Sequence, residues 1–164
     1  MITVPVGILT RMEPCPENAY LADHVDRLLA SYERLLGKTL LPAGERLQHA
    51  RKLYEAPFVV VSHGIEDEPV FNYANLAAQE LFEMDWDTFV TVPSRLSAGP
   101  MHRDERARLL ARVTKDGYID DYAGIRVTRA GRQFRIERAV VWNVFNADGT
   151  RAGQAATFGE WHFI

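Results

Sequence analysis

The chain has 164 residues, 47% of them apolar, which is enough for one hydrophobic core and argues against two full domains. Its net charge of −3 argues against nucleic acid or an anionic membrane surface as a partner, because neither attracts a mildly acidic protein. The single cysteine, Cys15, excludes an intramolecular disulfide and a cysteine-based metal cluster. No apolar run approaches the roughly 18 residues that span a bilayer, and no secretory signal is recognisable, so we expect a soluble, cytoplasmic protein.

The first 56 residues predict a helical extension. Apolar residues recur at three-, four- and seven-residue spacing over 17–36, ahead of Gly37, and form the stripe Leu21, Val25, Leu28, Leu29, Tyr32, Leu35 and Leu36. A second helix over 44–55 must end before Pro57, and its apolar side consists of Leu47, Ala50, Leu53 and Tyr54. The stripe has two uses that can hold together: it covers one face of a following sheet, or it pairs with its twin in a homodimer.

Residues 57–82 predict a strand, a turn, a second strand and a helix. The run 57–62 is apolar and rich in β-branched residues, as in a buried strand, and the acidic segment 66–69 is typical of a turn. The chain then returns as a strand over 70–73. Asn75 follows it and is placed to cap the first turn of a helix over 76–82.

The remaining segments predict helices first and strands afterwards. A short helix over 85–90 and a loop over 93–100 precede a helix over 103–116 that ends at Gly117. We expect this last helix to bury the apolar residues Ala107, Leu109, Leu110 and Val113. Three hairpin-connected strands follow, over 118–128, 132–145 and 150–161.

Two adjacent carboxylates, Asp120 and Asp121, lie in the first of these three strands. In regular alternation Asp121 shares a face with apolar residues, where a carboxylate needs a partner. Arg138 has the same position among apolar residues of the next strand. The alternation therefore predicts a buried Asp121–Arg138 pair, either as a structural ion pair or as the polar floor of a ligand cavity. A bulge at Gly124 would instead make Asp120 the inner residue.

Both faces of the strand over 132–145 are half apolar, which predicts that each face is covered. The N-terminal extension is the available cover for the outer face. In the last strand Ala155 and Ala156 leave little side-chain volume. At that point either a cavity forms or a helix approaches closely.

Two strands, several helices and three hairpin-connected strands are the element order of a PAS domain. Six segments are similar to the MEKHLA domain, a PAS-like module found alone in bacteria and at the carboxyl end of plant class III homeodomain–leucine zipper proteins: VVVSHG, FNYANLAAQELFEMDWDTF, PSRLSAGP, RDERARLLARV, GYIDDYAGIRVTRAGRQFRIERAVVWNV and GQAATF. The resemblance covers nearly all of residues 17–161. It implies an α+β fold with a five-stranded antiparallel sheet in the order 2-1-5-4-3, helices that enclose a cavity over one face, and a sensing or binding role.

The sequence identifies no cofactor. In haem-binding PAS domains a helix histidine ligates the iron, and the nearest candidate, His102, precedes its helix; no spacing typical of a metal site occurs. A flavin adduct would need a cysteine over the cofactor, and Cys15 is far from that helix in the sequence. Trp86, Tyr122 and Trp142 either stack on a planar ring or form ordinary core.

We predict a helical extension over 1–56 and a PAS-like domain over 57–164 that together act as a sensory module for a small molecule, not as an enzyme. The module would form a homodimer through its N-terminal helix and contact a signalling partner protein. The candidate pocket, with no catalytic or metal-ligating residue, consists of His63, Asn75, Phe82, Trp86, Arg95, Asp121, Tyr122, Arg138 and Trp142. Two alternatives stay open: an enzyme with an Asp, Tyr and His acid–base site, as in small isomerases and hydratases, and a dimerisation scaffold without a ligand.

Overall fold

A computed structural model describes residues 12–164; the first eleven residues, where the predicted extension begins, lie outside the described part. The helices are η1 (Pro16–Leu21), α2 (Ala22–Leu36), α3 (Arg46–Tyr54), α4 (Leu76–Phe82), α5 (Trp86–Phe89), η2 (Ser94–Ser97), η3 (Pro100–His102) and α6 (Arg103–Asp116). The strands are β1 (Val59–His63), β2 (Phe71–Ala74), β3 (Tyr118–Val127), β4 (Gln133–Phe145), β5 (Arg151–Phe158) and β6 (Glu160–Phe163). Every predicted helix and strand is present, although the helix predicted over 17–36 is divided into η1 and α2.

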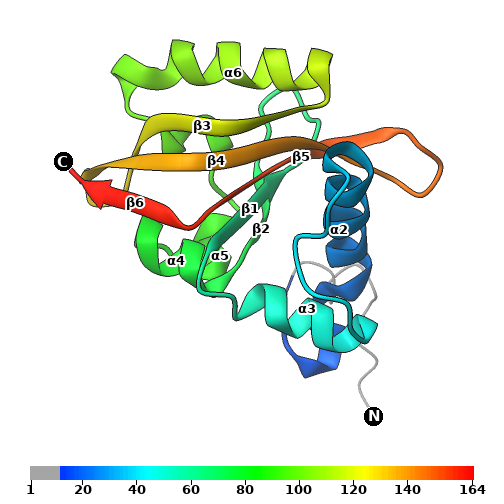
Figure 1. The fold of residues 1–164 in the computed structure, drawn as a ribbon. Coiled ribbons are helices and arrows are strands. Elements are labelled where there is room, and N and C mark those ends of the chain that lie inside the picture. Colours follow the sequence, from blue (N-terminus) through cyan, green and yellow to red (C-terminus); the bar gives the residue numbers. More distant parts are fainter. Residues whose placement is uncertain (1–11) are drawn as a thin grey trace.

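The strands form one antiparallel sheet in the order β2-β1-β5-β4-β3, as the family resemblance implies (Figure 1). The strand predicted over 150–161 is divided at Gly159 into β5 and β6, and both parts pair with β4. The two segments 57–73 and 118–158 are thus joined through the pairing of β1 with β5. The expected α+β, PAS-like architecture is confirmed.

Two bulges in adjacent strands reverse the alternation that the sequence suggests. Asp121 in β3 and Arg138 in β4 have φ angles of 54° and 52°, and the β3–β4 register shifts beside both. Phe134 and Trp142 therefore lie on opposite faces of the sheet, although they are eight residues apart. We call the face with Phe134, Ile136, Ala139 and Val141 the inner face, and the face with Trp142, Val144 and Ala155 the outer face.

The predicted buried pair of Asp121 and Arg138 is wrong for the same reason. Both residues are exposed, because a bulged residue leaves the regular alternation and points its side chain away from the sheet's packed faces. Arg138 instead pairs with Glu160 of β6 at 3.5 Å. The bulges lie at Asp121 and Arg138, not at Gly124, and Asp120 is exposed as well.

The N-terminal helices cover the outer face. In Figure 1, α2 crosses the sheet near the β4–β5 hairpin, and α3 lies beside α2. Leu28 of α2 is fully buried, and its carbonyl accepts a hydrogen bond from the Trp142 indole at 3.3 Å. The apolar stripe of α2 therefore packs on the sheet of its own chain, which is the first of its two predicted uses. Leu47 of α3 was expected on the buried side, but half of it is exposed because it lies on the solvent side of that helix.

The inner face is covered by α4, α5 and α6. Phe82 makes edge-to-face ring contacts with both Phe134 and Phe89. Further along the sheet, Leu109 and Val113 of α6 pack on Val141. The predicted burial of Ala107 on this side of α6 is wrong, because Ala107 is exposed and Arg106 is buried.

Candidate ligand-binding site

A cavity of about 60 Å³ lies between the inner face of the sheet and α6. It is lined by Val61, Ser62, His63, Phe71, Phe82, Ser97, Arg106, Leu109, Leu110, Tyr122, Arg126, Ile136, Val141, Gln154, Ala155, Ala156 and Phe158. A single water needs about 10–15 Å³ on a comparable measure, and an engineered cavity that binds benzene measures about 150 Å³. The cavity therefore suits a very small ligand or a few waters.

The walls of the cavity are mostly apolar, but two arginines enter it from different elements. Arg106 of α6 is 8% exposed, and Arg126 of β3 is 7% exposed. Burial, reinforced by the positive charge of Arg126, lowers the pKa of Arg106 to about 10. Among residues 12–164 no carboxylate lies within ion-pair distance of either guanidinium.

Tyr122 holds the Arg126 side chain. One guanidinium nitrogen donates to the Tyr122 hydroxyl at 3.3 Å, another donates to the Ile125 carbonyl at 2.8 Å, and the group lies 5.7 Å from the centre of the Tyr122 ring. The hydroxyl in turn donates to the Glu105 carboxylate at 2.9 Å. Gly124 makes this arrangement possible, because a Cβ there would collide with the Tyr122 hydroxyl. Burial raises the pKa of Tyr122, so the phenol stays protonated and can donate.

His63, the last residue of β1, contributes an unpaired nitrogen to the cavity lining. Its Nδ1 donates to the Gly64 carbonyl at 2.8 Å, which leaves Nε2 as the unprotonated nitrogen of a neutral ring. Nε2 is buried and has no hydrogen-bond partner within the described part of the chain. Burial lowers the pKa of His63, consistent with the neutral form.

Three of the nine predicted pocket residues line this cavity: His63, Phe82 and Tyr122. Two of the others are structural on the opposite side of the sheet. Trp142 packs edge-to-face on Tyr32 at 5.1 Å, and Trp86 packs in the same way on Tyr73 at 6.0 Å.

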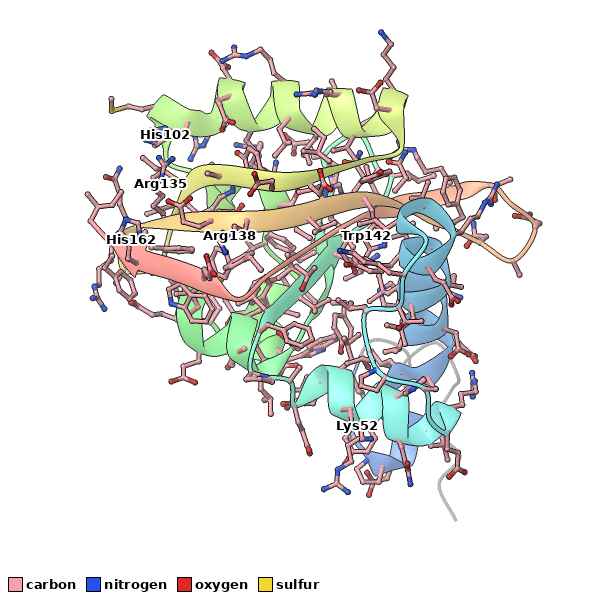
Figure 2. The ribbon with its side chains drawn as sticks, in the orientation of Figure 1. Lys52, His102, Arg135, Arg138, Trp142 and His162 are labelled. Carbon is pink, nitrogen blue, oxygen red and sulfur yellow. The ribbon has the colours of Figure 1, made fainter. Side chains whose placement is uncertain are left out.

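The remaining four predicted pocket residues also lie outside the cavity. Asn75 is fully buried as the cap of α4, where it accepts from the Ala78 amide at 3.2 Å. Arg95 is exposed and pairs with Glu68 at 3.4 Å. Asp121 and Arg138 are the exposed bulge residues already described. Figure 2 shows Arg138 near the β6 end of β4 and Trp142 near α2.

The cavity is also lined by three polar residues that the sequence did not predict, Arg106, Arg126 and Gln154. A signal for Arg106 existed, because it precedes Leu109 by three residues and Val113 by seven and so shares their helix face. Arg126 reaches the inner face only because the bulge at Asp121 shifts the alternation of β3. The amide nitrogen of Gln154 donates to the Leu110 carbonyl and to the Asn143 side chain, at 3.0 and 3.1 Å, which ties β5 to α6.

A second polar cluster lies on the outer face. His24 Nε2 is 2.9 Å from Ser62 Oγ, and Ser62 donates to Asn72 at 2.5 Å. Burial, with a smaller contribution from the charge of Arg27, holds the pKa of His24 at about 4. Because the Ser62 proton goes to Asn72, the imidazole is not positioned as a base for this hydroxyl.

Residues 12–164 contain neither a cluster of metal ligands nor a helix that could span a membrane. No three or more His, Cys, Asp or Glu side chains converge there as ligands for a metal ion. His102 is partly buried at the start of α6 and does not line the cavity. None of the helices in this part is at once long and apolar enough to cross a bilayer.

Comparison with known proteins identifies the family. The model of the MEKHLA domain matches residues 22–163, which is most of the chain. The chain belongs to the MEKHLA domain family. The match begins at the first residue of α2, so it includes the helices that cover the outer face of this MEKHLA domain. A search of curated proteins found no match.

Several solved structures share the fold of this MEKHLA domain. A PAS domain of a protein from Colwellia psychrerythraea is 12% identical with a TM-score of 0.60, over 71% of this chain and 94% of that one. A light-oxygen-voltage domain studied with a flavin analogue is 11% identical with a TM-score of 0.57, over 71% of this chain and 84% of that one. An RNA-binding light-oxygen-voltage receptor is 16% identical, TM-score 0.56, over 73% of this chain but only 36% of that one. At these identities the likeness shows a PAS-like fold.

Proposed function

We propose that this MEKHLA domain is a non-catalytic sensory module that binds a small molecule in the cavity between the inner face of the sheet and α6. The observation that carries the proposal is the cavity itself, with mostly apolar walls and a few convergent polar groups. The family resemblance implies a cavity between the sheet and the helices that cover one of its faces, and the proposed site has this position.

The strand β1 offers a route from the ligand to the opposite side of the molecule. His63 lines the cavity, and its neighbour Ser62 is hydrogen-bonded to His24 of α2 on the outer face. A ligand that displaces β1 would therefore alter the packing of α2. Signalling would follow through protein–protein contacts made by the N-terminal helices, with a partner protein or with a second copy of the chain.

A cavity-filling variant tests whether the cavity is the binding site. We expect some members of a panel of small molecules to raise the Tm of the purified protein, and Ala156→Leu to abolish this rise because the added side chain occupies the cavity. Ala107→Leu, on the exposed side of α6, is the matched control and should keep the response. A ligand response that survives in Ala156→Leu would place the binding site elsewhere, and no response to any compound would contradict the proposal.

The homodimer through the N-terminal helix is a separate part of the proposal. Leu28 and Val25 are fully buried in their own chain, so a dimer would use the half-buried side of α2 that carries Leu29 and Leu36. Light scattering combined with size-exclusion chromatography measures the mass directly. A monomer both with and without a bound ligand would contradict self-association.

A further inference from the structure

We propose that the ligand is a small carboxylate bound between Arg106 and Arg126, since two buried guanidiniums line one cavity and no carboxylate among the described residues pairs with either. This inference rests on the proposed function, because it identifies the chemistry of the molecule in the same cavity. Burying a charge without a partner is costly, so an anion that pairs with both groups would bind with a large gain in free energy.

Arg106 and Arg126 differ from the ion-paired arginines of the protein in both burial and pairing. Within residues 12–164, seven arginines form ion pairs with Asp or Glu, and each of them has at least 44% of its side chain exposed: Arg46, Arg51, Arg95, Arg112, Arg132, Arg135 and Arg138. Ion pairs at such exposed positions add little stability. Arg106 and Arg126 have the opposite combination, since they are buried and lack a carboxylate. A ligand would supply the missing partner.

The two arginines are also held differently, which suits them to bind one anion from two sides. Arg126 is fixed by the Tyr122 hydroxyl and the Ile125 carbonyl, and these two bonds leave further N–H groups of its guanidinium free to donate. Arg106 has no hydrogen-bond acceptor among residues 12–164 and comes from α6, across the cavity from the sheet. The Glu105 carboxylate accepts a hydrogen bond from the Tyr122 hydroxyl and makes no ion pair with either arginine. Glu105 therefore does not occupy the position of the bound anion.

The rest of the lining favours a carboxylate with a short apolar tail over an inorganic oxyanion. Val61, Phe71, Phe82, Ile136 and Phe158 surround the space beyond the arginines. A fully polar ion would leave its far side against these groups without hydrogen bonds, whereas an alkyl tail would pack on them. With a volume of about 60 Å³, the cavity favours chains as short as propionate.

The full-length protein in a buffer free of carboxylates and other oxyanions provides the test. Propionate in about 100-fold excess over its dissociation constant should raise the Tm by about 5 °C or more, whereas the neutral isostere propionamide should not. A Tm rise with propionamide or other neutral compounds, lost in Ala156→Leu but absent with propionate, would overturn the carboxylate assignment and leave the proposed function intact. A rise with phosphate or chloride instead of propionate would overturn the assignment too. No response to any compound would overturn both.

An arginine variant separates a ligand-binding role from a structural one. Arg106→Met should raise the Tm of the ligand-free protein, because it replaces an unpaired buried charge with an apolar side chain of similar length, and should abolish the response to propionate. Arg108→Met, on the exposed side of the same helix, should leave both quantities unchanged. A lower Tm in Arg106→Met together with an unchanged response to propionate would assign Arg106 to the structure of the domain and overturn its role in binding.

Discussion

His24 makes the stability of the domain depend on pH. Its pKa in the folded protein is about 4, against 6.5 for an imidazole in water, because burial and the charge of Arg27 disfavour the protonated ring. The unfolded chain binds this proton more readily than the folded one. The stabilisation is therefore fully present above pH 6.5, and it is lost as the pH falls from 6.5 toward 4.

We expect this one residue to account for about 2 kcal/mol of the free energy of unfolding lost between pH 7 and pH 5. Urea unfolding at the two pH values should show a loss smaller by that amount in His24→Gln, which cannot be protonated but keeps a polar group toward Ser62. The buried His63 is present in both proteins, so its contribution cancels. His162→Gln, at an exposed position, should retain the wild-type loss. Equal losses in His24→Gln and wild type would contradict the low pKa.

For Asn75 the sequence predicted one of the four hydrogen bonds that its side chain makes. The sequence predicted the cap of α4, and Asn75 Oδ1 does accept from the Ala78 amide. The same oxygen also accepts from the Val60 amide at 3.0 Å, and the side-chain nitrogen donates to the carbonyls of Leu53 and Phe58 at 3.0 and 2.8 Å. These three bonds join segments distant in the sequence. A capping rule concerns one turn of helix, so it cannot predict them.

The elements themselves were predictable because their signals are periodic and local, but the faces of β3 and β4 were not. A strand pattern assumes strict alternation, and a single bulge transfers every later residue to the other face. Here the bulges lie at Asp121 and Arg138, two residue types that give no sequence signal for a positive φ comparable to that of glycine. The misplaced Asp121–Arg138 pair and the missed Arg126 both follow from these two residues.

The bulge in β3 can be tested by substitution with glycine. Asp121 has a φ of 54° in the left-handed region, so Asp121→Gly should maintain the free energy of unfolding or raise it by about 0.5–1 kcal/mol. Asp120→Gly, at the adjacent exposed position without a positive φ, should lower it by about 0.5–1 kcal/mol through the entropy of the unfolded chain. Chemical denaturation of both variants measures the difference. An equal loss in the two variants would show that β3 continues through Asp121 without a bulge.

For the whole molecule, the main structural result is that the sheet is covered on both faces by its own chain. The inner cover consists of α4, α5 and α6, of which α4 and α6 line the cavity. On the outer face, α2 packs on β4 in the cluster that contains Trp142 and Val144, and α3 packs on α2. The sequence indicated both covers, because β4 is half apolar on each side. It did not distinguish between a stripe that packs on the sheet and one that pairs with a second copy, since both uses bury the same apolar residues.

A substitution of Leu28 tests whether α2 packs on its own sheet or pairs with a second copy of the chain. Its side chain is fully buried in the cluster that contains Tyr32 and Trp142, so Leu28→Ala should lower the free energy of unfolding by about 2–5 kcal/mol. Leu47→Ala, on the exposed side of α3, should change it by less than about 0.5 kcal/mol. Unfolding should be measured at two protein concentrations, because stability that comes from a dimer rises with concentration, whereas packing within one chain does not. If Leu28→Ala left the monomer's stability intact and only reduced the mass in solution, α2 would be a dimerisation helix and the outer face of the sheet would need a different cover.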